Sequence, residues 1–205
     1  YSSLYFLPEL GIKRLSPFIK DVAAHEFFHI VTPLSIHAEQ IHDFDFITPA
    51  MSEHLWLYEG VTEYSAHHVQ VKYDIINEEK FLHTIRQKMV SGDKYKRNLP
   101  FTAMSKGCLD KYEDQYGNVY EKGALIGMCI DIKLRSLTDG KYGIQQMMQD
   151  LSKTYGKNKA FKDNELFSEI EKVTGKKEVK DFLLKYVADT NLLPLKEVMA
   201  LVGYE

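Results

Sequence analysis

Two histidines and a glutamate lie close together in the stretch AHEFFHIV, residues 24–31. His25 and His29 are four residues apart, and Glu26 directly follows the first histidine. On an α-helix, a step of four residues rises about 6 Å and turns about 40° beyond one full turn, so the two imidazoles point the same way. The spacing therefore favours a shared metal ion with a carboxylate beside it. A buried helix that uses these histidines only for packing is the alternative.

Two histidines are one ligand short of a catalytic zinc site, which takes three protein ligands and leaves the fourth position to water. One large class of metallopeptidases places a third histidine six residues after the second, with a glycine halfway. This chain has Ser35 and Thr32 at those positions, so that class is excluded. His37 and His42 are nominal alternatives, but neither lies at a recognised ligand spacing, and a surface or supporting role is expected for both.

A second acidic pair lies further along, in LWLYEGVTEY at residues 55–64. Glu59 and Glu63 are one turn apart and share a face if this segment is helical. We therefore expect Glu59 to bind the metal and Glu63 to accept a hydrogen bond from a ligand imidazole. His67 lies one turn further on the same stripe, but a fourth protein ligand would close the site to water. We expect His67 to pack or to support the site.

Helices must hold these side chains in place, and the sequence predicts little else. Ser16 and Pro17 are expected to start a helix that runs to about residue 31 and is ended by Pro33. A long ordered loop with room for a short helix should follow over residues 32–52, and a second helix should then run from Ser52 through the Glu59 segment.

The remaining chain is also expected to be mainly helical. Asn77 should cap a helix over 78–90, a loop should follow from about 91 to 118, and another helix should begin near Tyr120. The shorter helices expected after it cover about 142–154, 164–174, 177–188 and 195–202. The stretch SLYFL, residues 3–7, has the pattern of an edge strand whose partners lie outside the chain.

Composition narrows the class of protein. A chain of 205 residues with 44% hydrophobic residues can bury one sizeable core. The formal net charge of -3 and the scattered lysines exclude a basic stripe, so nucleic acid is not an expected partner. Cys108 and Cys129 lack the close spacing of thiolate metal sites. No apolar run approaches the roughly 18 residues of a membrane span.

The chain begins at Tyr1 without a methionine, and we expect it to be a piece of a longer protein. No targeting segment is recognisable in it. Cytoplasmic and exported locations of the parent protein both stay open.

Three separated motifs resemble the gluzincin zinc peptidases related to aminopeptidase N and thermolysin: AHEFFH, WLYEGVTEY and YEKGALIG, in this order. Within that group, residues 1 to about 130 are most similar to the glycyl aminopeptidase family. The resemblance implies a mainly α, thermolysin-like catalytic domain that fills the chain. We expect one domain over 1–205, with zinc-ligand helices in 1–75, a helix, loop and Tyr-x-Lys-Gly helix in 76–138, and further helices in 139–205.

The resemblance also implies a role for each site residue. His25, His29 and Glu59 would bind one zinc ion, and Glu63 would hold His25 in orientation. Glu26 would take a proton from the zinc-bound water and later deliver it to the departing amine.

Tyr120 of the third motif would donate a hydrogen bond to the oxyanion of the tetrahedral intermediate. A buried structural tyrosine is the alternative, because the chain has 13 tyrosines and Tyr116 lies close by.

The implied activity is hydrolysis of a peptide substrate near its N-terminus. Tyr58 stands where aminopeptidase N relatives usually carry asparagine, and the segment that holds a substrate's amine is expected upstream of Tyr1. A zinc endopeptidase therefore stays open, as does a non-catalytic helical interaction module that retains a metal site. Family members usually also carry a β-rich domain before this region and a PDZ domain after it, and neither is in this chain.

Some residues have no role that the sequence alone assigns. His54 and His83 have no partner pattern and are expected at the surface or at an interface. The run HDFDFI, residues 42–47, would line the substrate cleft or form a packed Ω-loop.

Overall fold

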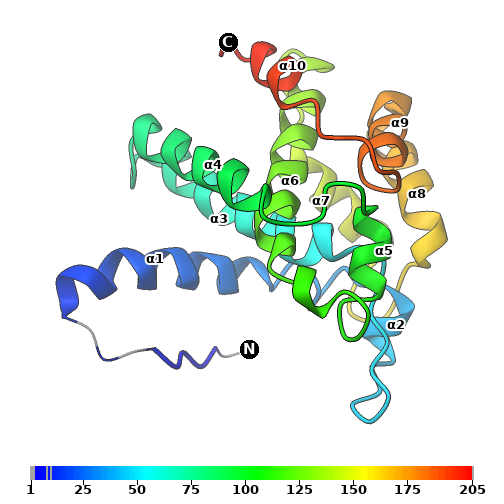
Figure 1. Ribbon diagram of the computed structural model, residues 1–205. Helices are drawn as coiled ribbons and strands as arrows, with labels where there is room; N and C mark the ends of the chain where they lie inside the picture. The colour runs from blue at the N-terminus through cyan, green and yellow to red at the C-terminus, as the bar shows by residue number, and fades with distance from the viewer. Residues whose placement is uncertain (1–2, 8, 10, 205) are drawn as a thin grey trace.

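The computed structural model describes residues 3–7, 9 and 11–204, and this part of the chain is helical and contains no strand. The predicted mainly α fold class is confirmed. The α-helices shown in Figure 1 are α1 Ile12–Phe28, α2 Glu39–His42, α3 Val61–Lys72, α4 Glu78–Gly92, α5 Phe101–Lys106, α6 Asn118–Ser136, α7 Ile144–Thr154, α8 Leu166–Thr174, α9 Lys177–Tyr186 and α10 Leu195–Ala200. A π-helical turn spans Trp56–Gly60, and single 3-10 turns span Glu113–Gln115 and Asp163–Glu165.

Helix α6 forms the centre of the fold and packs against the π turn, α3 and α4 (Figure 1). Every residue from Gly123 to Ile132 is buried, as expected of a helix surrounded by others. Asp131 is the charged residue in that run, and its carboxylate accepts hydrogen bonds from Tyr64 Oη at 2.8 Å and from Arg135 Nε at 3.1 Å. Its burial is therefore compensated.

Helix α1 begins at Ile12, earlier than the sequence predicted. Pro17 therefore lies inside the helix and not in its first turn. The Gly11 carbonyl accepts hydrogen bonds from the amides of Arg14 and Leu15 at 2.9 and 3.1 Å, so a turn has already formed before the proline. Pro17 then removes only one hydrogen bond near the helix start. His25 is the buried residue of α1, which otherwise lies along the surface.

The edge strand expected over residues 3–7 is absent from the described residues. These five residues are irregular, and the side chains of Leu4 and Phe6 are almost fully exposed. A strand needs a neighbour to pair with, and the described part of the chain offers none.

The loop expected over 91–118 contains α5 and a 3-10 turn. Phe101 and Met104, one turn apart, are buried in the core, and the Phe101 amide donates a hydrogen bond to the Val187 carbonyl at 2.9 Å. This helix is held by contacts with a distant segment, so its short apolar pattern did not reveal it. The short helices expected after residue 140 are close to the observed ones. Asn77 caps α4 as expected, since its Oδ1 accepts a hydrogen bond from the Lys80 amide at 2.9 Å.

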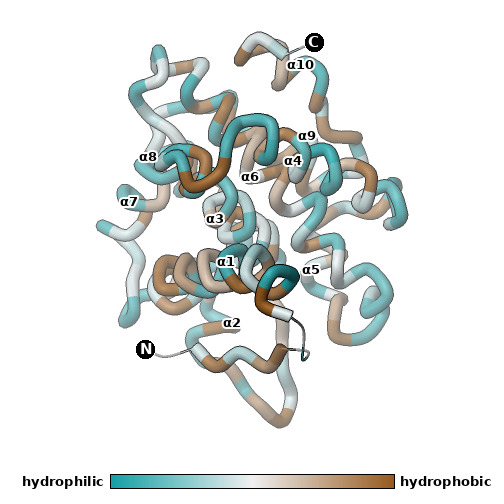
Figure 2. Tube along the Cα trace, turned by 90° about the vertical axis from the view of Figure 1, so that its left-hand side faces the viewer, coloured by the Kyte–Doolittle hydropathy of each residue, from teal (hydrophilic) through white to brown (hydrophobic). Residues whose placement is uncertain are grey.

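Hydrophilic residues interrupt the hydrophobic ones along the chain, as the colouring of Figure 2 shows. Among the described residues, none of the helices has the length and apolar content needed to cross a membrane.

Candidate metal centre and active site

His25 on α1, His29 at the C-terminal cap of α1 and Glu59 on the π turn lie close together. One ligand atom from each lies within 4.8 Å of the others, and the described residues hold no second group of this kind. Nε2 of His25 is 3.3 Å and Nε2 of His29 is 3.6 Å from Oε2 of Glu59. Two ligands about 2.0–2.1 Å from one zinc ion at a tetrahedral angle are about 3.3 Å apart. The three side chains therefore fit zinc.

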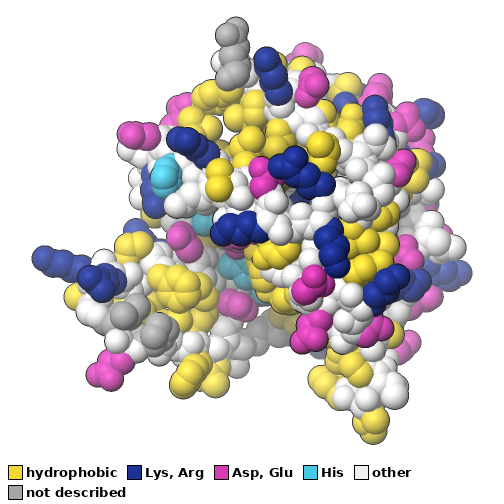
Figure 3. Space-filling view, viewed as in Figure 1, with side chains coloured by type: hydrophobic (Ala, Val, Ile, Leu, Met, Phe, Trp, Pro, Cys, Tyr) yellow, Lys and Arg dark blue, Asp and Glu magenta, His cyan; other side chains and the backbone are white. Residues whose placement is uncertain are grey.

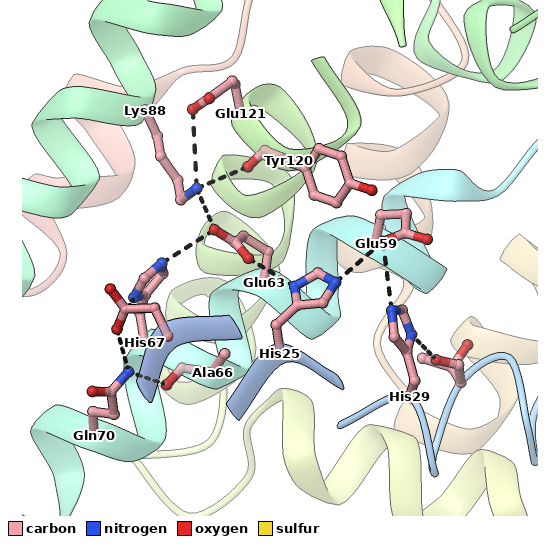
Figure 4. A network of polar contacts seen from close by, with 12 residues as sticks. His25, His29, Glu59, Glu63, Ala66, His67, Gln70, Lys88, Tyr120 and Glu121 are labelled. Carbon is pink, nitrogen blue, oxygen red and sulfur yellow. Dashed lines mark hydrogen bonds and ion pairs between the residues drawn. The ribbon is translucent and has the colours of Figure 1, made fainter. Parts of the chain in front are cut away.

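The second nitrogen of each imidazole is held by another group. Nδ1 of His25 lies 2.7 Å from Oε2 of Glu63, and Nδ1 of His29 lies 3.0 Å from the carbonyl oxygen of Thr32 (Figure 4). Donation from both Nδ1 atoms leaves both Nε2 lone pairs for a metal, which is how protein zinc ligands are usually oriented. The sequence predicted the Glu63 contact, whereas the Thr32 carbonyl had no signal because backbone oxygens carry none.

Charge at the site favours a cation. Burial lowers the pKa of His25, but hydrogen bonds and charge from Glu59 and Glu63 outweigh it and raise that pKa to about 9. The two carboxylates therefore stabilise positive charge at the imidazole, as they would stabilise a cation bound beside it.

Glu59 lies on a π-helical turn, which the sequence did not predict. The backbone of this turn touches α6: a Cβ added at Gly60 would lie 2.3 Å from the Gly123 carbonyl carbon. Both glycines are thus required by a close approach of two backbones. The close contact also sets the position of the adjoining Glu59.

Replacing Gly60 by alanine is expected to lower the free energy of unfolding by about 1–3 kcal/mol, because the new methyl group overlaps the α6 backbone. The turn that carries Glu59 must then shift, so zinc affinity should also fall. Urea unfolding and a zinc titration measure the two effects. Gly156→Ala is the matched control, since a Cβ there meets nothing within 4 Å, and its effect should stay within about 0.5 kcal/mol. Equal stabilities of the two variants would contradict the close approach.

Glu63 has two further partners besides His25. Its Oε1 lies 2.6 Å from Nζ of Lys88 and 3.2 Å from Nε2 of His67 (Figure 4). Burial would raise the pKa of Glu63, but the hydrogen bonds from His25 and His67 and the charge of Lys88 hold that pKa well below its usual range. Of the two roles expected for His67, packing or support of the site, this contact matches support. Lys88 was missed, because nothing in the sequence separates it from the other basic residues.

Glu26 and Tyr120 line a cleft of about 710 Å³ between α1, α3, α4 and α6, which His25 and Glu63 also line. The cleft is the hollow above α1 in Figure 3, and histidine side chains are visible inside it. The rings of Tyr120 and His25 have centroids 5.7 Å apart. Glu26 also borders a second hollow with His29 and Glu59, so this residue lines both openings.

The hydroxyl of Tyr120 is suited to donating a hydrogen bond. Burial, together with the charge of Glu59, raises the pKa of Tyr120 well above its usual range, so the proton stays on the oxygen at neutral pH. Tyr116 Oη lies 3.4 Å away and is the near neighbour of that hydroxyl.

Other histidines lie outside the ligand group. Nε2 of His37 is 3.0 Å from Nδ1 of His42, so these two contact each other. His54 was expected at the surface, but it is buried: its Nε2 donates to the Asp163 carbonyl at 2.8 Å, and its Nδ1 accepts from Trp56 Nε1 at 3.1 Å. A buried histidine of this kind serves the core through two hydrogen bonds. His83 is exposed, as expected.

Neither Tyr58 nor the 42–47 run lines the cleft. Tyr58 is buried, and its hydroxyl accepts a hydrogen bond from the Ala38 amide at 2.9 Å. The 42–47 run ends in a projecting loop whose Phe46 and Ile47 side chains are 89% and 91% exposed, so it is neither packed nor part of the cleft (Figure 1).

Comparison with solved structures shows which fold this is. The chain is similar to an aminopeptidase N family protein from Idiomarina loihiensis, with a TM-score of 0.80, 22% sequence identity, and coverage of 95% of this chain and 34% of that one. The chain thus spans about a third of the length of that protein. No curated protein matches.

Residues 19–126 match the model of the M61 glycyl aminopeptidase family, and the chain belongs to that family. The resemblance inferred from the three motifs is confirmed at the level of the family. The matched range includes the whole ligand group, Glu26 and Tyr120.

Proposed function

We propose that this chain hydrolyses peptide bonds with one zinc ion held by His25, His29 and Glu59. The observation that carries the proposal is the convergence of two Nε2 atoms on one Glu59 oxygen, at 3.3 and 3.6 Å, with both Nδ1 atoms engaged elsewhere. Zinc in such a site supplies a Lewis acid that polarises the substrate carbonyl and makes water a better nucleophile at neutral pH.

The chain's own residues supply the proton transfers. Glu26 lies in the cleft beside the ligands, where its carboxylate takes a proton from the attacking water and delivers it to the leaving amine. Tyr120 donates its hydroxyl proton in a hydrogen bond to the carbonyl oxygen as negative charge develops there. A structural metal site needs neither group, and this supports an enzyme over an interaction module.

We further propose that the activity is that of an aminopeptidase and that the chain is the catalytic domain of a longer protein. The family supports the first part. The second is supported by the similar protein, which extends well beyond the region that this chain matches.

The full-length protein is expected to bind one zinc ion per chain and to hydrolyse glycyl or alanyl amides. N-acetylation of the same substrates should slow hydrolysis by about 100-fold or more, because a site that binds the free amine leaves its polar groups unpaired against the acetylated form. Elemental analysis and a comparison of kcat/KM values measure this. Equal rates for both substrate forms would identify an endopeptidase, and zinc without turnover would favour a binding module.

A further inference from the structure

Lys88 is a buried cation next to the candidate active site. It lies on α4 and is 7% exposed. Lysine is seldom buried without a partner, because removing an ammonium group from water is costly. Here Nζ lies 2.6 Å from Oε1 of Glu63, 3.2 Å from the carbonyl oxygen of Tyr120 and 4.0 Å from Oε2 of Glu121 (Figure 4). The ammonium group therefore has partners on two other helices.

The two groups nearest to Lys88 belong to different parts of the catalytic apparatus. Glu63 contacts Lys88 with one oxygen and His25 with the other, at 2.6 and 2.7 Å. A glutamate side chain has several rotatable bonds, and fixing one oxygen limits where the other can lie. Lys88 thus restrains the carboxylate that orients the ring of His25.

Tyr120 is restrained at its backbone. Its carbonyl lies in the first turns of α6, and the contact with Nζ ties this end of α6 to α4. The Tyr120 ring leans toward His25, with a centroid separation of 5.7 Å. A single ammonium group therefore contacts both the support of a metal ligand and the residue that would bind the oxyanion.

We propose that Lys88 is a positioning residue that sets the orientation of His25 through Glu63 and the placement of Tyr120 through its carbonyl. This inference rests on the proposed zinc peptidase activity. Its rival is an ion pair that only stabilises the packing of α4 on α3. The two differ in what they predict for metal binding, for the coordination geometry and for turnover.

The test compares Lys88→Met with Lys72→Met in the full-length protein. Lys72 is an exposed lysine at the end of α3, and its amine contacts Gln145. Lys88→Met should weaken zinc affinity by roughly 10–100-fold, as losses of outer contacts to metal ligands do, and Lys72→Met should not change it. Chelator competition measures the affinity.

Two further readouts separate positioning from packing. The visible spectrum of the cobalt-substituted protein should change in Lys88→Met, because a reoriented His25 alters the coordination geometry. The kcat should fall with KM held within about threefold, since the lost contacts serve the transition state and not substrate binding. Lys88→Arg keeps the charge and should recover part of the zinc affinity.

A double-mutant cycle tests the route through Glu63. In the Glu63→Gln background, adding Lys88→Met should weaken zinc binding by less than about threefold, because the residue through which Lys88 acts has already been altered. Full additivity of the two losses would overturn the route.

The proposal also fails if folded Lys88→Met keeps the zinc affinity, cobalt spectrum and kcat of Lys72→Met. If Lys88→Met does not fold, Lys88→Gln takes its place, and failure of both to fold would mark Lys88 as a packing residue and overturn the proposal. A parent protein that binds no zinc and cleaves no peptide would instead refute the proposed function.

Discussion

Glu26→Gln is expected to retain zinc and to lose nearly all peptide hydrolysis, by about 10²–10⁴-fold in kcat. Glutamine has the same shape but cannot accept the proton that the attacking water must lose. The ligand atoms of His25, His29 and Glu59 converge without any contribution from Glu26, so metal binding should be unaffected. Elemental analysis and kcat measured on the same preparation of the full-length protein give both quantities.

Glu79→Gln provides the control for this result. Glu79 is an exposed acid at the start of α4, and its substitution removes the same charge from the chain. It should keep both zinc and activity. Hydrolysis by Glu26→Gln at the rate of Glu79→Gln would show that another group accepts the proton, and the assignment of Glu26 would be lost.

Glu59→Gln is expected to weaken zinc affinity by more than about 100-fold, a larger loss than outer contacts to metal ligands produce. The amide oxygen that replaces the carboxylate is neutral, so the site loses one ligand charge while the side chain keeps its volume. Glu59 lies 3.3 and 3.6 Å from the two ligand histidines. Among the described residues, no other acid forms a group of three potential ligands with these histidines. Competition with a chelator of known affinity gives the size of the loss.

The order of the glutamate variants is the sharpest check. Glu59→Gln should lose the most affinity, Glu63→Gln should lose roughly 10–100-fold, and Glu79→Gln should be unchanged. If Glu63→Gln lost as much as Glu59→Gln, the division between a ligand and its support would be wrong.

Local patterns in the sequence predicted much of this arrangement. The four-residue spacing of His25 and His29 is a property of a single helix, and α1 is present, although it ends at Phe28 and not near residue 31, so that His29 is its C-terminal capping residue. Helices α7 to α10 lie within a few residues of their expected positions, because glycine, lysine and asparagine mark their ends locally. Asn77 caps α4 for the same reason.

The features that sequence reasoning missed depend on residues far apart in the chain. The π turn at Trp56–Gly60 accompanies the close approach of Gly60 to Gly123, and a single segment cannot reveal such contacts. Lys88 acquires its role only when α4 packs on α3, and His54 is buried by a segment more than a hundred residues away. The residue types of Ser16 and Pro17 favour the start of a helix, and the predicted start of α1 was therefore wrong. The helix already begins one turn earlier, at Ile12.

The burial pattern of α1 has a consequence for the whole domain. Helix α1 lies along the surface, and its buried side chain is that of His25, which would bind the ion. Glu59 comes from the π turn, which packs on the central helix α6. An ion held by these residues would cross-link the periphery of the fold to its centre. Metal affinity and the attachment of α1 would then be two expressions of one equilibrium, in which loss of the ion loosens the helix and loosening of the helix releases the ion.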